Sequence, residues 1–343
     1  MMGSTNIDIG GVKLEIKFTG KESDRYAGAI GKIFPDYLSA EGNMNIPLVV
    51  RERPDVPLDK LFGGGEAGAL RDYFLKIEGR FPFTEVSPGW RRRRTKTLLR
   101  SSRGNGAALG SPSLIPLLSR DRMAVFYHNS FLLFADYEKP KGEVLILEGD
   151  FSDTVSSVSL AVQAAVGLFA PLYNGMMLHA CSAEIDGGGY IFFGGSGAGK
   201  STIADLMGRK RLLADDGSLC FRRGKDYCTM PSPFTQVPSR ENRGELIQAK
   251  RFFFLIKDKD NFVEEVKPGE AILRIMHNHI HFFRYFPGKE AKETFISVKE
   301  IVERFPFYNL HFTRYINPLT FFGEGGYKRG DRRKEFMSMS DDH

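Results

Sequence analysis

The stretch of sequence that decides the fold is Tyr190-Ile191-Phe192-Phe193-Gly194-Gly195-Ser196-Gly197-Ala198-Gly199-Lys200-Ser201. Its last eight residues match the pattern G-x-x-x-x-G-K-[ST] at every fixed position. The four apolar residues before the motif predict a buried strand, and the residues from Gly199 onward predict a helix. Glycines let the backbone curl so that successive N–H groups face one anion. The stretch therefore predicts a strand, a phosphate-binding loop and a helix within an α/β fold.

The residue types in this motif suit the phosphates of ATP and a bound Mg²⁺ ion. The N-terminus of the following helix adds a partial positive charge. Lys200 would place a flexible charge on the β and γ phosphates, and Ser201 would offer its hydroxyl to Mg²⁺. The alternative, a chance glycine-rich turn, is disfavoured by the strand and helix that flank it. The predicted nucleotide-binding residues are Gly194, Gly195, Ser196, Gly197, Ala198, Gly199, Lys200, Ser201 and Thr202.

Two adjacent carboxylates, Asp215 and Asp216, follow the run 211–214, only fifteen positions past Lys200. Adjacent side chains at the end of a strand point in different directions. One can therefore hold Mg²⁺ while the other accepts the proton of a hydroxyl group that attacks the phosphate. The alternative is a capped turn before Gly217, but the nearby phosphate-binding motif favours the metal and base roles.

A single histidine, His179, lies on the apolar run 177–184, which predicts a strand beside residues 190–193. A lone histidine on an apolar strand is more often a buried structural residue. Next to bound phosphates it can instead donate to the γ-phosphate or tune a neighbouring base. Both interpretations stay open at this point.

The block from residue 178 to residue 216 resembles the superfamily of HPr kinase/phosphorylase and phosphoenolpyruvate carboxykinase. Both families have a histidine-bearing strand, a strand leading into the phosphate loop, a short helix and an aspartate pair. The resemblance is strong over about forty residues. The chain is much shorter than the carboxykinases, so it looks most like a diverged HPr kinase-related protein.

The resemblance implies an α/β P-loop core that transfers the γ-phosphate of Mg-ATP to a serine or threonine hydroxyl of a peptide or protein. Asp215 would be the base, and Arg243, in a loose match to a further active-site segment, would contact the γ-phosphate or the acceptor. A solvated loop charge is the alternative for Arg243. The implied catalytic residues are Asp215, His179, Lys200 and Arg243, and the implied metal ligands are Ser201 and Asp216.

Two other functions stay open. The same site could phosphorylate a small hydroxyl compound such as free serine. A different class of protein would bind ATP without turnover, as a sensor or scaffold. An intact Lys200, Ser201 and aspartate pair weighs against that class, because a scaffold has no physical need for two adjacent carboxylates.

The chain of 343 residues is long enough for two domains. Residues 1–150 contain an alternating run at 12–18 and short apolar runs such as 46–50 and 123–128, which predict a β-rich N-terminal domain with a possible role in acceptor recognition. A helix capped by Asp153 opens the kinase core, which extends over residues 151–323. Residues 324–343 form a polar, charged tail.

The net charge is +6 and the pI is near 9.1, a balance that first suggests nucleic acid or an anionic surface. However, residues 91–103 read RRRRTKTLLRSSR, with seven basic residues and no acid, within a loop predicted over 87–116. Without that segment the chain would hold 41 basic and 42 acidic residues. The segment is a solvated loop or an electrostatic clamp for an acidic acceptor. No nucleic-acid-binding motif is found, so no nucleic acid partner is predicted.

Three cysteines, with no C-x-x-C pair, imply neither a disulfide framework nor a zinc site and favour the cytoplasm. The N-terminus has no signal-peptide layout, and the apolar run 160–172 is too short to cross a membrane. The sequence therefore predicts a protein without a membrane partner and leaves a homo-oligomer open.

Three alternating histidines, His277, His279 and His281, form H-x-H-x-H. On a strand all three would share one face, as metal ligands can. Residues 271–283 predict a helix, however, on which only His277 and His281 would meet. The prediction is a surface helix rather than a metal site.

Overall fold

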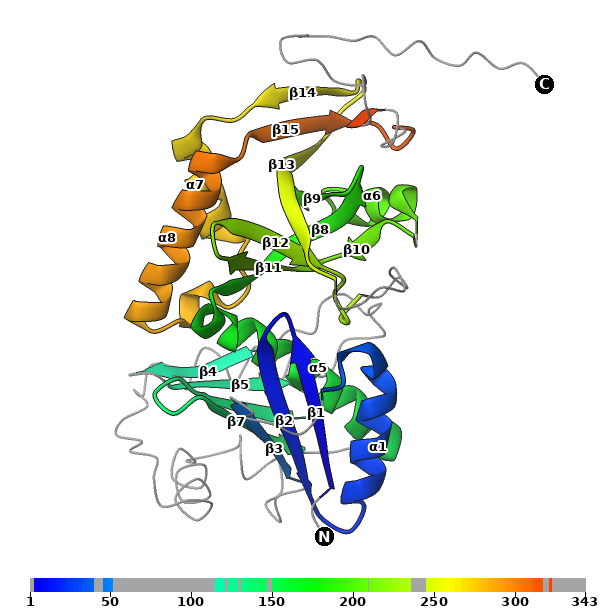
Figure 1. Cartoon of the computed structure of the whole chain (residues 1–343), viewed down its shortest axis with the longest axis vertical. Helices are drawn as coiled ribbons and strands as arrows, with labels where there is room; N and C mark the ends of the chain where they lie inside the picture. The colour runs from blue at the N-terminus through cyan, green and yellow to red at the C-terminus, as the bar shows by residue number, and fades with distance from the viewer. Residues whose placement is uncertain are drawn as a thin grey trace, which may run out of the picture.

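The structure is a computed structural model that describes residues 3–39, 46–51, 115–120, 123–128, 131–146, 150–208, 210–235, 245–316 and 321–322. Over these residues the protein is mixed α/β, with two mixed β-sheets and several helices (Figure 1). Three predicted features lie outside the described residues: the basic segment 91–103, Arg243 and the tail 324–343.

The first sheet has the strand order β1-β2-β3-β7-β6-β5-β4. Strand β2 pairs parallel with β3, and β3 with β7, while the other neighbours are antiparallel. Every second residue of β2 is buried, as its alternating sequence predicts. The strands are β1 (Gly3–Ile9), β2 (Val12–Thr19), β3 (Ile46–Arg51), β4 (Ile115–Arg120), β5 (Met123–His128), β6 (Phe131–Asp136) and β7 (Lys141–Ile146).

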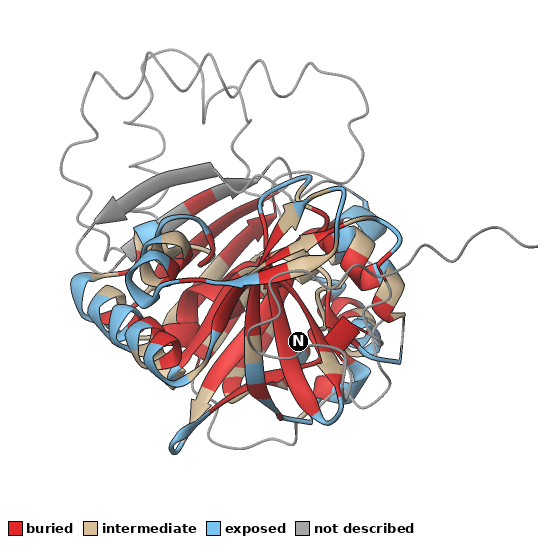
Figure 2. Cartoon of the chain, turned by 90° about the horizontal axis from the view of Figure 1, so that it is seen from above, coloured by how far each residue is buried: buried red, intermediate tan, exposed pale blue. Residues whose placement is uncertain are grey.

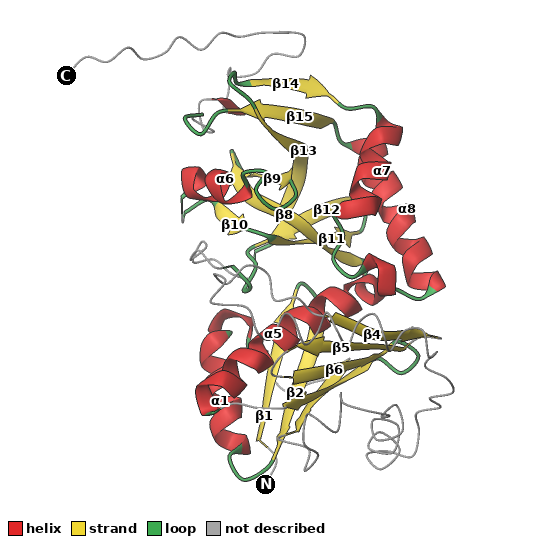
Figure 3. Ribbon diagram, turned by 180° about the vertical axis from the view of Figure 1, so that it is seen from behind, coloured by secondary structure: helices red, strands yellow, loops and turns green. Residues whose placement is uncertain are grey.

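Two helices, α1 (Ser23–Ile33) and α5 (Phe151–Phe169), pack against this sheet and against each other (Figure 3). Helix α1 was not predicted, because the N-terminal part of the sequence was interpreted as almost wholly β. It buries Tyr26, Ala27 and Ile30, which share one helical face. A short 3₁₀ turn, η1 (Pro35–Tyr37), follows it.

The second sheet has the order β10-β8-β11-β12-β13-β15-β14, with β9 between β8 and β13. Strands β9, β13 and β15 run parallel, so their carboxyl ends lie at one edge. In parallel α/β sheets, ligands bind at such an edge. The strands are β8 (Gly175–Ile185), β9 (Gly188–Phe193), β10 (Leu212–Ala214), β11 (Gly217–Arg223), β12 (Asp226–Met230), β13 (Ile247–Lys257), β14 (Phe262–Glu265) and β15 (Phe307–Phe312).

The helices of this second part are α6 (Lys200–Met207), α7 (Pro268–Asn278) and α8 (Gly288–Arg304), with the 3₁₀ turns η2 (Ala170–Tyr173) and η3 (Phe283–Tyr285). The strands are buried over most of their length, and exposed residues gather on the outer helices and turns (Figure 2). Strands predicted at 177–184, 190–193, 211–214 and 251–257 are all present, within a few residues at each end.

Helix α5 begins three residues before the sequence prediction. Asp150 is the N-cap, and its Oδ1 accepts from the Asp153 N–H at 2.9 Å. Asp153 completes a capping box, because its Oδ2 accepts from the Asp150 N–H at 3.4 Å. The expected cap at Asp153 was therefore wrong.

The apolar run 160–172 lies within the longer helical span Phe151–Tyr173, which could cross a membrane by length and composition. Its most apolar window is 67% buried inside the protein, as expected for the core helix of a soluble protein. The described part of the chain has one such helix.

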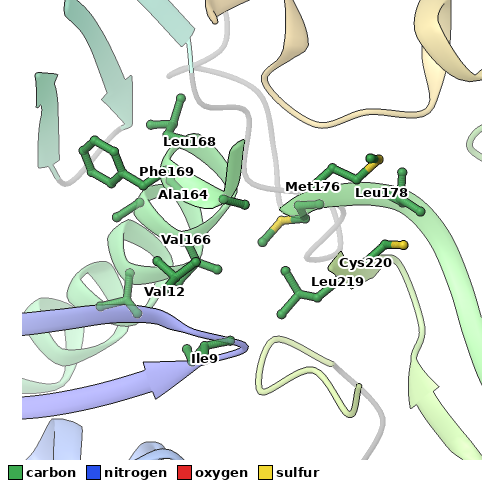
Figure 4. Close-up of a cluster of buried hydrophobic side chains, with 14 of the residues drawn as sticks. Ile9, Val12, Ala164, Val166, Leu168, Phe169, Met176, Leu178, Leu219 and Cys220 are labelled. Carbon is green, nitrogen blue, oxygen red and sulfur yellow. The ribbon is translucent and has the colours of Figure 1, made fainter. Parts of the chain in front are cut away.

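The two sheets share one hydrophobic core around α5. Ile9 and Val12, beside the β1–β2 turn, approach Val166 on α5 and Leu219 on β11 (Figure 4). Arg223 of β11 donates to the carbonyl of Gly10 in that turn. The Tyr37 hydroxyl donates to the Pro231 carbonyl at 2.6 Å. Helix α5, assigned by sequence to the second part, thus packs on the first sheet, and the domain boundary at residue 150 stays a prediction.

Candidate functional site

The glycine-rich loop lies between β9 and α6, so the predicted strand, loop and helix are all present around the motif. Gly197 and Gly199 have φ angles of 77° and 108°, in the region that favours glycine. Gly195, Ser196 and Gly197 are exposed, whereas Gly199 is the buried N-cap of α6. The loop thus presents its backbone to solvent at the carboxyl end of β9 and the start of a helix.

The remaining residues of the motif differ in how far they are exposed. Ser201 is exposed and Thr202 is half-buried, both in the first turn of α6. Ala198 is half-buried and Gly194 is buried. The hydroxyl of Ser201 therefore lies at the solvent-facing side of the loop, where an ion could reach it.

We expect Gly199→Ala to destabilise the protein by about 1–3 kcal/mol, because φ is positive there and the new Cβ would lie 2.5 Å from the Phe312 ring. Urea unfolding followed by circular dichroism measures the change. Gly195→Ala is the matched control in the same loop, since its Cβ would meet nothing within 4 Å. Equal unfolding midpoints for the two variants would contradict the expectation.

Lys200 is buried and its ammonium group is fully engaged. Nζ donates to the carbonyls of Gly194 at 2.6 Å and Gly195 at 3.2 Å. It also lies 3.1 Å from Asp216 Oδ1 and 3.0 Å from His179 Nε2. A buried charge is costly unless it is paired and hydrogen-bonded, and these contacts meet that requirement. Lys200 therefore connects the glycine-rich loop to His179 and Asp216.

A register shift explains why Asp216 reaches His179. Strands β10 and β11 both pair with β8, and the aspartates lie between them. The pairing slips at Gly217, which lies opposite both His179 and Ala180. The Asp216 carbonyl accepts from the Ala180 N–H at 3.0 Å, and its Oδ1 lies 3.1 Å from His179 Nε2. The irregularity therefore turns one carboxylate into the site, while the neighbouring Asp215 is half-buried.

The pKa of Asp216 is lowered to about 2. Burial alone would raise this pKa, but the hydrogen bond from His179 and the charge of Lys200 outweigh it. The carboxylate is therefore ionised at any physiological pH. Its side chain is 41% exposed, so it stays accessible to an ion or ligand.

The Nε2 atom of His179 faces two groups with opposite demands. The Lys200 ammonium only donates, so Nε2 must accept from it as a lone pair. The Asp216 carboxylate only accepts, so Nε2 must donate to it as an N–H. One nitrogen can satisfy only one of them at a time, and the position of its proton therefore depends on where Lys200 and Asp216 find their other partners.

Two of the alternating histidines join this site, contrary to the sequence prediction. Helix α7 ends at Asn278, and only His277 is an exposed helical residue. Beyond it, Ile280 forms an isolated bridge with Leu178 of β8. The rings of His279 and His281 lie 6.4 Å and 5.2 Å from that of His179. The expected surface helix over 271–283 was therefore wrong beyond residue 278.

The signal for this segment was present in the sequence. His279-Ile280-His281-Phe282 alternates polar and apolar residues, as a strand does, but the helical periodicity before it dominated the prediction. No group of three or more His, Cys, Asp or Glu side chains in the described parts of the chain is arranged to hold a metal ion. His279 and His281 are neighbours of His179 through their ring contacts.

Both of these histidines are held neutral. Burial, together with the charges of His179, Arg274 and Lys200, lowers the pKa of His279 to about 4. Burial and the charge of His179 likewise lower the pKa of His281 to about 4. The site thus combines one low-pKa carboxylate with two neutral imidazoles.

These shifts predict that the protein loses stability as the pH falls from about 6.5 to about 4. In this range the unfolded chain protonates His279 and His281 but the folded chain does not, which favours unfolding by up to about 3 kcal/mol per histidine. The low pKa of Asp216 stabilises the fold above pH 3.8, and this contribution is lost only towards pH 2, outside the range.

Urea unfolding at pH 7.5 and pH 5.0 measures this effect. His279→Gln should flatten the pH dependence, whereas the matched control His277→Gln, at an exposed position, should leave it unchanged. A wild-type protein that is equally stable at both pH values would contradict the prediction.

One further side chain lies beneath the site and was not predicted. The Cys181 thiol is buried, and burial together with the charge of Asp215 raises its pKa well above the usual range. This cysteine is therefore a packing residue rather than a nucleophile. Cys220 and Cys228 are also free and buried.

Comparisons with known proteins assign no family to this chain, because no protein-family profile matches it and a search of curated proteins finds no match. The resemblance to HPr kinase-related proteins therefore rests on residues 178–216. The structural observations that bear on the chemistry implied by this resemblance are the contacts among His179, Lys200 and Asp216.

Proposed function

We propose that this protein is an Mg-ATP-dependent kinase with an HPr kinase-like P-loop core, which transfers the γ-phosphate to a serine or threonine hydroxyl of a peptide or protein. One observation carries the proposal: Lys200, at the end of the glycine-rich loop, lies within 3.1 Å of both Asp216 and His179. A cation, an ionised carboxylate and an imidazole thus converge where the loop and α6 present backbone N–H groups.

The residues present fit a magnesium nucleotide. Mg²⁺ prefers carboxylate, hydroxyl and phosphate oxygens. Asp216 is ionised and partly exposed, and Ser201 is exposed in the first turn of α6. We assign these two residues to the metal and the loop Gly194–Thr202 to the phosphates. Mg²⁺ would neutralise charge that develops on the phosphate oxygens.

In the proposed reaction, Asp215 accepts the proton of the acceptor hydroxyl. The hydroxyl oxygen attacks the γ-phosphorus, the bond from that phosphorus to the β–γ bridging oxygen breaks, and ADP leaves. In this reaction Lys200 follows the phosphates and leaves its contact with His179. His179 then contacts the γ-phosphate instead. Arg243 is assigned to the γ-phosphate or the acceptor.

The remaining assignments belong to the same proposal. Residues 1–150 would recognise the acceptor, with the basic segment 91–103 attracting an acidic peptide. We place the protein in the cytoplasm, with no nucleic acid and no membrane as partner.

Incubation of the purified protein with Mg²⁺ and γ-labelled ATP tests the function. The acceptors are acidic and neutral serine- and threonine-containing peptides, free serine and other small hydroxyl compounds, and calorimetry measures Mg-ATP binding in parallel. Label on a peptide is the expected result. Label on a small hydroxyl compound would replace the acceptor class, and binding without transfer to any acceptor would favour a sensor or scaffold. Failure to bind Mg-ATP would overturn the proposal.

A further inference from the structure

We propose that Arg274 of α7 and His279 form a binding subsite for a carboxylate group of the acceptor, next to His179. The subsite would select acceptors that carry a carboxylate close to the hydroxyl that receives the phosphate. This inference rests on the proposed function for its kinetic consequences, whereas the binding of a carboxylate to Arg274 can be tested without phosphate transfer.

Arg274 lies over the row of the second sheet that directly precedes the glycine-rich loop. Phe254 of β13 pairs with Phe193, the last residue of β9, and with Asn309 of β15. The guanidinium carbon of Arg274 lies 3.7 Å from the centre of the Phe254 ring. Its side chain is 31% exposed. The arginine therefore lies one strand away from the start of the loop, near the edge at which ligands bind in such sheets.

Arg274 has donor groups to spare. Its Nη1 donates to Asn309 Oδ1 at 2.7 Å and to Glu270 Oε1 at 3.3 Å. Among the described residues, Nε and Nη2 have no hydrogen-bond partner. A guanidinium binds a carboxylate through two parallel N–H groups, and Nε and Nη2 form one such pair. One complete bidentate edge of Arg274 is therefore available to a ligand.

The contacts of Nη1 fix the direction of this free edge. In the planar guanidinium the edge between Nε and Nη2 points opposite to Nη1, and Nη1 points to Asn309 on β15. Arg274 lies over β13, which has β15 on one side and β9 on the other. The free edge therefore faces β9, the strand that leads into the glycine-rich loop.

His279 lies on the side that the free edge faces. Its ring packs against Phe193 at 5.2 Å and Phe254 at 5.8 Å, and it lies 6.4 Å from the ring of His179. His279 is 8% exposed, and its Nδ1 has no partner among the described residues. Buried polar atoms are nearly always hydrogen-bonded. A carboxylate on the Arg274 edge would supply an acceptor for an Nδ1–H of the neutral imidazole.

The subsite lies on the opposite face of the sheet from α6. Phe193 and Phe254 belong to the same hydrophobic cluster as residues of α7, whereas α6 packs in the cluster of Phe192 and Phe253 (Figure 3). The proposed function assigns the nucleotide phosphates to the start of α6, where Lys200 is the cation. Arg274 is therefore assigned to the acceptor rather than to ATP.

Matched acceptors test this selectivity. In one peptide aspartates flank a single serine, and in the other asparagines do. We expect kcat/KM of the wild type to be about 10–100-fold higher for the aspartate peptide, because a charge-assisted bidentate contact contributes that much. L-serine and L-serinamide form the corresponding small-molecule pair, so the two sources of a carboxylate are distinguished.

Arg274→Lys keeps the positive charge but loses the fork. It should reduce the ratio within the preferred pair to less than about threefold and leave the affinity for Mg-ATP unchanged. Arg304→Lys, at an exposed position at the end of α8, is the control and should keep the wild-type ratio. An equal loss of activity with both members of the pair would mean that Arg274 only ties α7 to β15. Weaker Mg-ATP binding would assign its free edge to the γ-phosphate. Either result would overturn the inference.

A titration with acetate separates failure of this inference from failure of the proposed function. Protein with isotope-labelled arginine is examined by NMR, and the Nε–H signal of Arg274 is assigned through its loss in Arg274→Lys. That signal should shift saturably with sodium acetate and stay in place with acetamide. His279→Phe, which keeps a flat ring without Nδ1, should weaken acetate binding about 3–10-fold. An Arg274 signal that acetate does not move would contradict the subsite even in an active kinase.

Discussion

Replacing Lys200 with alanine is expected to weaken Mg-ATP binding by at least about 100-fold, the equivalent of about 2.8 kcal/mol. Its ammonium group is buried and ends at the carbonyls of the glycine-rich loop, so it is the cation best placed to follow the β and γ phosphates. A charge-assisted contact to phosphate in a partly desolvated site is worth more than an exposed one.

Calorimetry with Mg-ATP measures the loss. Lys225→Ala is the control, since that lysine is exposed in the turn between β11 and β12. The unfolding midpoint of Lys200→Ala must be measured as well, because the substitution also leaves Asp216 with His179 as its remaining partner in this cluster. A folded Lys200→Ala protein with wild-type ATP affinity would rule out the phosphate-binding interpretation of the loop.

Asp215→Asn is expected to lower the rate of phosphate transfer by about 100-fold or more while Mg-ATP binds with nearly unchanged affinity. An amide has the shape of the carboxylate but cannot accept the proton of the acceptor hydroxyl, and general-base catalysis contributes about 10²–10⁴-fold. Transfer of label from γ-labelled ATP to the acceptor found for the wild type measures the rate.

Substitution of the adjacent residue, Asp216, is the comparison for the Asp215→Asn variant. Asp216→Asn should raise the Mg²⁺ concentration required for half-maximal activity, because an amide is a weaker ligand for Mg²⁺. Asp205→Asn, at an exposed position on α6, should behave as wild type. If Asp215→Asn keeps full activity, the base is another group, and a shared effect of both substitutions on Mg²⁺ dependence would place both carboxylates on the metal.

Features encoded by short stretches could be predicted from the sequence. The glycine-rich motif with its apolar strand needed only local periodicity and residue type, and the structure has that strand, loop and helix. The turn between β8 and β9 is similar. Asp186 and Gly187 both adopt positive φ, as their sequence favours for a two-residue hairpin. The aspartate pair was likewise recognised from its distance along the chain to Lys200.

Other features were decided by contacts between distant segments. The sequence placed Asp216 after a strand, but the slip in pairing at Gly217 is what directs its carboxylate to His179. Helix α1 was missed because its amphipathic pattern is short. The segment is stabilised as a helix by packing against β1 and α5.

The histidines after α7 show the same division. The predicted helix over 271–283 was correct as far as residue 278, yet the chain then leaves the helix to pair with β8, and this pairing brings His279 and His281 to the site. Sequence by itself determined the strand, the glycine-rich loop and the helix around the motif, because these depend on neighbours a few positions apart. The tertiary structure alone decided which of them meet, because strand pairing is set by partners that lie about 40 to 100 residues away along the chain.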